Sequence, residues 1–126
     1  MKKRILIIED NEKNRMLEKD LLEIEGFEVL EAKDAAEGIV LAQKERPDGV
    51  VMDVRLPDMR GTQAAVKLRQ DPGTSGIPII FVTASVIGEG MEEIKAFPDT
   101  MFLTKPIDTR TFAGKIRQYL SKKSCG

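Results

Sequence analysis

The sequence contains no histidine, and this absence excludes more chemistry than any other feature of its composition. Ser–His–Asp triads, histidine-ligated zinc sites and phosphohistidine carriers all need an imidazole, so this chain can form none of them. The single cysteine, Cys125, cannot make an internal disulfide or a zinc knuckle. The chemistry of the chain must therefore come from carboxylates, hydroxyls, lysines and backbone groups.

Long apolar segments and a strong excess of charge are also missing. The first apolar run, Ile5–Ile8, has four residues, which is far short of the roughly 7–15 of a signal-peptide core or the ~18 of a membrane span. The 126 residues carry 20 basic and 21 acidic side chains, for a formal net charge of −1. We therefore expect one cytoplasmic domain that contacts neither membranes nor nucleic acid directly.

Short apolar runs alternate with segments of helical periodicity along the chain, which is the pattern of repeated βα units. Three of the runs are continuous and suit parallel strands buried on both faces, whereas two are more polar and suit the edges of a sheet. In chain order, the expected strands are Ile5–Ile8, Glu28–Ala32, Gly49–Met52, Ile79–Val82 and Thr100–Thr104. The pattern predicts a flavodoxin-like doubly wound (βα)5 sandwich with strand order 2-1-3-4-5.

Between the strands, apolar residues recur at the spacing of helices that pack one face on a sheet. The expected buried stripes are Met16, Leu17, Leu21 and Ile24; Ala36, Ile39, Val40 and Ala42; Ala64, Ala65 and Leu68; and Phe112, Ile116, Tyr119 and Leu120. Asp34 and Glu37 have the spacing of a capping box at the start of the second helix. Two glycines weaken the fourth expected helix, between Val86 and Phe97, by about 1 kcal/mol each. We expect this helix to be short.

Polar side chains follow the apolar runs at the points where the expected strands end. Glu9 and Asp10 follow the first run, and Asp53 follows the third; Thr83 and Lys105 follow the fourth and fifth. Because the carboxyl ends of parallel strands lie at one edge of a sheet, we expect these side chains to converge. A helix cap or a solvated lysine would explain each residue alone, but structure alone does not require three carboxylates in one crevice.

Three clustered carboxylates need a cation, since two unit charges 4 Å apart near a protein surface repel by about 4 kcal/mol. Lys105 supplies one positive charge only. A site with few oxygen ligands and room for water favours Mg²⁺ over Ca²⁺. A carboxylate beside a metal ion, a lysine and a hydroxyl suits phosphoryl transfer to that carboxylate, and an ionised nucleophile needs no general base. The expected site therefore suits phosphoryl transfer to Asp53.

In this order, the acidic pair, Asp, Thr and Lys-Pro resemble the receiver domain of two-component response regulators over essentially the whole chain. Val50–Gly61 is similar to the family's phosphoacceptor segment, and Glu9–Asn14 resembles the opening of single-domain and hybrid-kinase receivers. The resemblance implies a switch and not a turnover enzyme, and the output of this switch would be protein binding or relay of the phosphoryl group. A sensor histidine kinase or a histidine phosphotransfer protein would phosphorylate it. A downstream protein would bind its face formed by the fourth helix, fifth strand and last helix.

The resemblance also implies a role for each site residue. Asp53 would accept the phosphoryl group. Mg²⁺ would be bound by Asp53, by Asp10, by Glu9 largely through a water molecule, and by the backbone carbonyl of Arg55. Arg55, which is bulky and cationic, would also influence the lifetime of the phosphorylated state.

Other positions would respond to the phosphoryl group. Thr83 and Lys105 would contact its oxygens, and Phe102 would be the switch aromatic. The Lys105–Pro106 peptide bond would be cis, and Ser85 would influence access of water to the phosphoryl group. The segment 95–100 lacks the small Gly-Ala pair usual in the family, so the fourth helix is the least certain part of the partner face.

Two other functional classes remain open at this stage. A small haloacid-dehalogenase-like phosphatase also uses Asp, Thr, Lys and Mg²⁺, but its second Asp would fall at the position of Arg55. A flavin-binding flavodoxin would need a phosphate-binding loop after the first strand, where the sequence has Glu9–Asn14. We expect residues 1–122 to form a single receiver domain and residues 123–126 to form a flexible tail.

Overall fold

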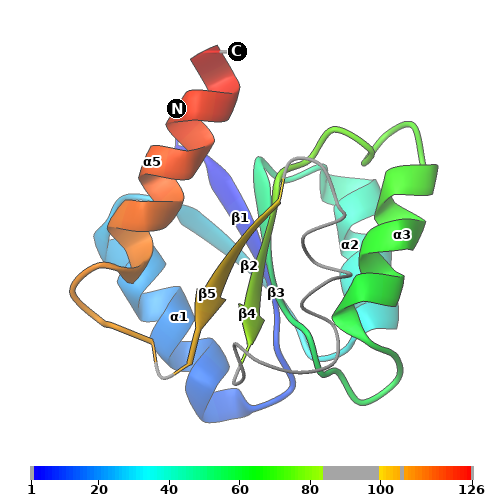
Figure 1. The fold of residues 1–126 in the computed structure, drawn as a ribbon, viewed down its shortest axis with the longest axis horizontal. Helices are drawn as coiled ribbons and strands as arrows, with labels where there is room; N and C mark the ends of the chain where they lie inside the picture. The colour runs from blue at the N-terminus through cyan, green and yellow to red at the C-terminus, as the bar shows by residue number, and fades with distance from the viewer. Residues whose placement is uncertain (1, 84–99, 106, 126) are drawn as a thin grey trace.

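The structure, a computed structural model, describes residues 2–83, 100–105 and 107–125 (Figure 1). The strands of this part are β1 (Arg4–Ile8), β2 (Glu28–Ala32), β3 (Gly49–Asp53), β4 (Ile79–Thr83) and β5 (Thr100–Thr104). They form one parallel sheet in the order β2-β1-β3-β4-β5. The predicted fold class and strand order are therefore confirmed.

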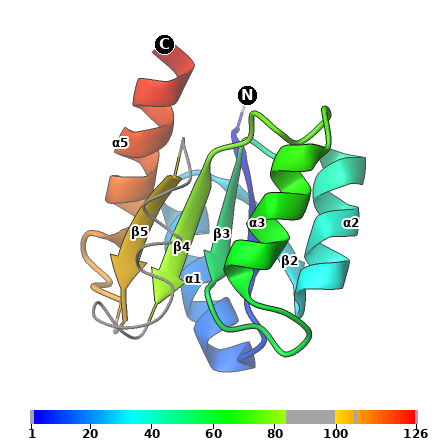
Figure 2. The same cartoon turned by 45° about the vertical axis from the view of Figure 1, so that its right-hand side comes forward.

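Helices cover both faces of the sheet, as Figures 1 and 2 show. On one face lie α1 (Glu12–Ile24) and α5 (Phe112–Cys125), and on the other lie α2 (Ala35–Glu45) and α3 (Gly61–Gln70). Alternate residues of β1 enter the two cores: Ile5 and Ile7 face α1 and α5, whereas Leu6 and Ile8 face α2 and α3. This alternation is that of a strand buried on both faces.

The predicted fourth helix and the predicted end of the domain both stay predictions. The segment expected to form the fourth helix lies outside the described residues. The domain boundary expected at residue 122 stays a prediction, and α5 is described as far as Cys125. The predicted stripes of α3 and α5 are confirmed. Ala64, Ala65 and Leu68 of α3 are buried, as are Phe112, Ile116 and Leu120 of α5, and Tyr119 packs against the α5 core cluster.

The predicted buried stripe of α1 is wrong at three of its four positions. Met16, Leu17 and Ile24 are 54%, 39% and 83% exposed, whereas Glu18 and Leu22 face the sheet. The predicted stripe and the buried one are offset by one residue along α1. Hydrophobicity alone favours the predicted stripe, because it contains no carboxylate. The fold instead buries the stripe that contains Glu18.

The α2 stripe is also partly wrong, because Ala36 and Val40 are exposed while Ala35, Gly38 and Ala42 are buried. The reason is the close approach of α2 to β1. A Cβ atom on Gly38 would lie 2.3 Å from Cδ1 of Ile8, so a larger residue there would force the Ile8 side chain or α2 to shift. The smallest residues of α2 therefore set the face that it buries.

Candidate active site

The parallel register brings the predicted site residues to one edge of the sheet. Glu9 directly follows β1, Asp53 ends β3, Thr83 ends β4, and Lys105 directly follows β5. Figure 2 shows the ends of β3, β4 and β5 side by side at this edge. The backbone continues the pairing beyond the last strand, since the amide of Lys105 donates to the carbonyl of Thr83 at 2.7 Å. The predicted convergence of these residues is confirmed.

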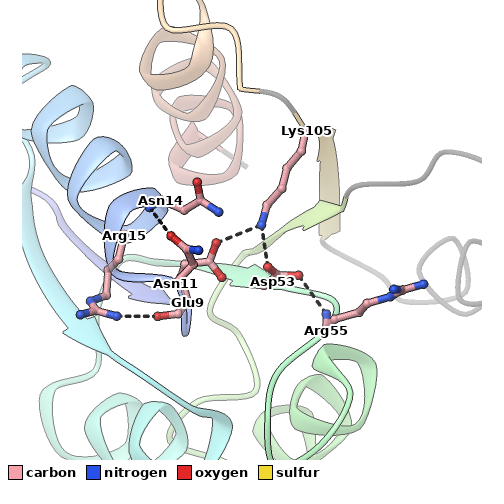
Figure 3. A network of polar contacts seen from close by, with 7 residues as sticks. All are labelled: Glu9, Asn11, Asn14, Arg15, Asp53, Arg55 and Lys105. Atoms are coloured by element: carbon pink, nitrogen blue, oxygen red, sulfur yellow. Dashed lines mark hydrogen bonds and ion pairs between the residues drawn. The ribbon is translucent and has the colours of Figure 1, made fainter.

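Lys105 joins the buried Glu9 to the partly buried Asp53 (Figure 3). Its Nζ donates to Oδ2 of Asp53 at 2.7 Å and to Oε1 of Glu9 at 2.9 Å. Burial alone would lower the pKa of Lys105, but its hydrogen bonds to Asp53 and Glu9 raise it overall. The ammonium group therefore stays charged and holds the two carboxylates together.

Glu9 provides the observation that fits a metal ion. Burial, aided by the hydrogen bond and charge of Asp53 and opposed by Lys105, raises the pKa of Glu9 to about 7. Its second oxygen, Oε2, is buried and has no hydrogen-bond partner among the described residues. Oxygen atoms of Glu9, Asp10 and Asp53 lie within 4.8 Å of one another. Carboxylate oxygens at this spacing suit a hard divalent cation, which would also favour the ionised form of Glu9.

The remaining oxygen of the Asp53 carboxylate is held by its own loop. The backbone amide of Arg55 donates to Oδ1 of Asp53 at 2.9 Å. The guanidinium group of Arg55 extends away from Lys105 and Glu9, as Figure 3 shows, and the residue is exposed. Asp53 is therefore fixed in orientation by Lys105 on one side and by the loop backbone on the other.

Sequence reasoning missed two residues that hold the β1–α1 turn. The side-chain oxygen of Asn11 caps α1 by accepting from the amide of Asn14 at 3.0 Å. Arg15 donates from Nη1 to the carbonyl of Glu9 at 2.9 Å, and its Nε lies 3.4 Å from Oε1 of Glu31. Asn before a helical segment is a recognisable capping signal. The contacts of Arg15 have no such signal, because they depend on the fold.

Glu18 was missed as well, although it influences the site. Its side chain is buried on α1, with 2% of the residue exposed. Burial raises the pKa of Glu18 to about 8, and the charges of Glu9 and Asp53 act in the same direction while Lys105 opposes them. Glu18 is therefore a fourth carboxyl group within the electrostatic range of the site.

Of the other predicted residues, the structure describes Thr83 at the same sheet edge and Phe102 in the middle of β5. Thr83 is 8% exposed at the end of β4. Phe102 is half-buried on β5, opposite Phe81 of β4, and packs against the core cluster beneath α2 and α3. Ser85 and Pro106 lie outside the described residues. The roles expected for Ser85 and for the Lys105–Pro106 peptide bond stay predictions.

Comparison with known families identifies the family to which the chain belongs. Residues 5–117 match the sequence profile described as "Response regulator receiver domain". The chain belongs to this family. The family resemblance expected from the strand-end residues is therefore confirmed. The matched region contains β1 from its second residue onward, the other four described strands and all of the site residues named above.

Relatives resemble this receiver along nearly its whole length. The polar-differentiation response regulator DivK of Brucella anthropi is 35% identical over 120 residues, which are 95% of this chain and 98% of the relative. A CheY-like receiver domain protein of Methanospirillum hungatei JF-1 has 31% identity and a TM-score of 0.89, and the match covers 99% of this chain and 98% of the other.

A second similar structure contains a metal ion. The receiver domain of sensor histidine kinase PA1611 of Pseudomonas aeruginosa PAO1 is 25% identical to this receiver, with a TM-score of 0.87, and the match covers 96% of this chain and 99% of that one. A magnesium ion is coordinated in the active-site cleft of that protein.

Family membership decides between the functional classes left open by the sequence. The chain is a receiver domain of two-component signal transduction, a phosphoacceptor class that works with histidine kinases and downstream targets. Neither the phosphatase nor the flavodoxin alternative is supported by these matches. Within the described residues, no helix of this receiver is long and apolar enough to span a membrane.

Proposed function

We propose that this receiver accepts a phosphoryl group on the carboxylate of Asp53 from a phosphohistidine of a sensor histidine kinase or a histidine phosphotransfer protein. The observation that carries the proposal is the double contact of Lys105 with Asp53 and Glu9, beside a buried carboxylate oxygen without a partner among the described residues. These 126 residues contain no histidine, so the phosphohistidine donor must lie outside this sequence.

The residues present divide the work of the transfer among themselves. An oxygen of Asp53 attacks phosphorus, the P–N bond to the donor imidazole breaks, and the electron pair stays on the imidazole nitrogen. Lys105 Nζ then pairs with phosphoryl oxygens in place of Asp53 Oδ2, and the Thr83 hydroxyl donates to another oxygen. Mg²⁺, held by Glu9, Asp10, Asp53 and the carbonyl of Arg55, would neutralise charge on the transferring group.

The output of the switch is protein binding or relay of the phosphoryl group. We assign protein binding to the face formed by the expected fourth helix, β5 and α5, where the half-buried Phe102 on β5 would follow the movement of Thr83 toward the phosphoryl group. The exposed Arg55, beside Asp53 in the chain, and Ser85 would set the lifetime of the phosphorylated state by controlling water access. We place this signalling in the cytoplasm, without direct contact to nucleic acid or membrane.

Acetyl phosphate with Mg²⁺ tests the proposal, with Asp53→Asn as the variant. The parent should gain one phosphoryl group per chain, measured by intact-protein mass spectrometry, and the group should be lost slowly after the donor is removed. Asp53→Asn should not be labelled, because the amide is not a nucleophile. Asp20→Asn, which removes an exposed carboxylate of α1, is the matched control and should be labelled like the parent.

Two results would contradict the proposal. Labelling of Asp53→Asn at the parent's level would place the acceptor elsewhere. Sustained hydrolysis of p-nitrophenyl phosphate by the parent would return the phosphatase alternative.

A further inference from the structure

The loop between β3 and α3 is closed tightly against the end of β3. Arg55 and Arg60 form an antiparallel β-bridge across its base, and the amide of Gly61 donates to the carbonyl of Val54 at 2.7 Å. A Cβ atom on Gly61 would lie 2.4 Å from the carbonyl oxygen of Asp53, so the loop cannot accept a larger residue there without a backbone shift. This packing defines the base of the loop that carries the Arg55 carbonyl.

The far part of the same loop is held by α2 through Asp58. Its Oδ1 accepts from the amide of Ala35 at 3.0 Å, and its Oδ2 accepts from the amide of Ala36 at 2.9 Å. These amides begin α2 and have no acceptor within the helix. The next amide, that of Glu37, is bound at 2.8 Å by Asp34, the N-cap of α2 itself. Asp58 thus completes a cap that would otherwise lack two acceptors.

The charge of Asp58 suits this position. The hydrogen bond from the amide of Ala35 is the largest cause that lowers the pKa of Asp58, and the bond from Ala36 adds to it. A carboxylate is also favoured at the positive end of a helix dipole. The side chain is exposed, so these backbone contacts, and not burial, hold it in place.

We propose that Asp58 is a positioning residue for the metal site: by tethering the β3–α3 loop to α2, it holds the Arg55 carbonyl in register with Glu9 and Asp10. α2 itself is fixed on β1 by the close contact between Gly38 and Ile8, and Glu9 directly follows Ile8. The tether therefore connects the loop that carries the Arg55 carbonyl, through α2 and β1, to Glu9 and Asp10. The inference rests on the proposed function, since it takes the Arg55 carbonyl as a ligand.

The test compares Asp58→Ala with Asp34→Ala. Both variants remove acceptors from the first turn of α2, so both should lower the midpoint of thermal unfolding, but only Asp58→Ala releases the loop. Isothermal titration calorimetry with MgCl₂ should show that Asp58→Ala binds Mg²⁺ about tenfold more weakly than the parent. This is the lower end of the loss in metal affinity that follows when an outer-shell partner of a metal site is removed. Asp34→Ala should bind Mg²⁺ as the parent does. Asp58→Asn, which keeps one acceptor oxygen, should lie between the parent and Asp58→Ala.

A second measurement separates positioning from loss of structure. With acetyl phosphate, Asp58→Ala should be labelled slowly at low Mg²⁺ and at the parent's rate once Mg²⁺ saturates the site. Equal Mg²⁺ affinity in Asp58→Ala and the parent, or an equal loss in Asp58→Ala and Asp34→Ala, would overturn the inference. If Asp58→Ala does not fold, the comparison of Asp58→Asn with Asp34→Asn decides in the same way. Failure of the proposed function would instead appear as absent labelling of the parent at saturating Mg²⁺.

Discussion

Among the described residues, acidic side chains outnumber basic ones at the sheet edge that forms the site. Lys105 is the one cation that the described hydrogen bonds place among Glu9 and Asp53, while Asp10 and Glu18 add two further acidic groups to the same region. Such a cluster is unfavourable without a metal ion, because like charges in a partly buried site repel strongly. Burial, and then repulsion from the neighbouring carboxylates, raises the pKa values of Glu9 and Glu18.

Glu18→Gln should change how stability depends on pH. The folded-state pKa of Glu18, about 8, lies above its ordinary value of 4.5, so the folded protein keeps a proton that the unfolded chain releases. The parent should therefore lose stability as pH rises from about 4.5 to about 8, on the order of a few kcal/mol from this group. The neutral amide cannot lose a proton, so Glu18→Gln should lose less stability over this range.

Urea unfolding at pH 5 and pH 8, in the presence of EDTA, measures the effect. Glu23→Gln removes an exposed carboxylate from the same helix and should keep the pH dependence of the parent. An identical pH dependence of Glu18→Gln and the parent would show that Glu18 is ionised in the folded protein.

At the scale of single elements, glycine decides how closely α2 lies on the sheet. Gly38→Ala would normally strengthen a helix by up to about 1 kcal/mol. Here the new Cβ atom would lie 2.3 Å from Cδ1 and 2.6 Å from Cγ1 of Ile8, whose side chain is fully buried. We expect a net loss of about 1–3 kcal/mol from overpacking, measured by urea unfolding.

Gly114→Ala in α5 is the matched control for this prediction. Among the described residues, no atom outside its own helical turn would lie within 4 Å of its Cβ, and the residue is exposed, so this substitution should stabilise the protein. The two glycine substitutions should therefore have opposite signs. A stabilising Gly38→Ala would mean that α2 can move away from β1 at little cost.

The elements also show which parts of the fold are readable from sequence. The strands and their order were predictable, because continuous β-branched runs ended by polar residues are typical of the buried strands of a parallel sheet. The convergence of Glu9, Asp53 and Lys105 followed from that topology. The inner faces of α1 and α2 were not predictable, since they depend on the burial of Glu18 and on the contact of Gly38 with one side chain. The Asp58 tether joins residues distant in sequence, and no local pattern indicates it.

At the scale of the whole molecule, the metal site and the folded state depend on each other. The candidate ligands come from the ends of β1 and β3, which are neighbours only in the folded sheet. A ligand that binds the folded state alone stabilises it, by about 2.7 kcal/mol at one hundred times its dissociation constant. For a domain of this size, each kcal/mol raises the midpoint of thermal unfolding by about 4 °C. Mg²⁺ at that level should therefore raise the midpoint by about 10 °C.

Asp10→Asn should keep or raise the stability of the metal-free protein and weaken its Mg²⁺ binding. Removing one carboxylate from the cluster relieves repulsion, so the variant in EDTA should be at least as stable as the parent. It should also lose most of the Mg²⁺-induced rise in the midpoint, because a direct ligand is gone. Scanning calorimetry of parent, Asp10→Asn and the exposed-site control Asp20→Asn, each with EDTA or MgCl₂, measures both effects. A full Mg²⁺ response in Asp10→Asn would place the ion away from Glu9, Asp10 and Asp53, and a less stable variant in EDTA would make Asp10 a structural residue.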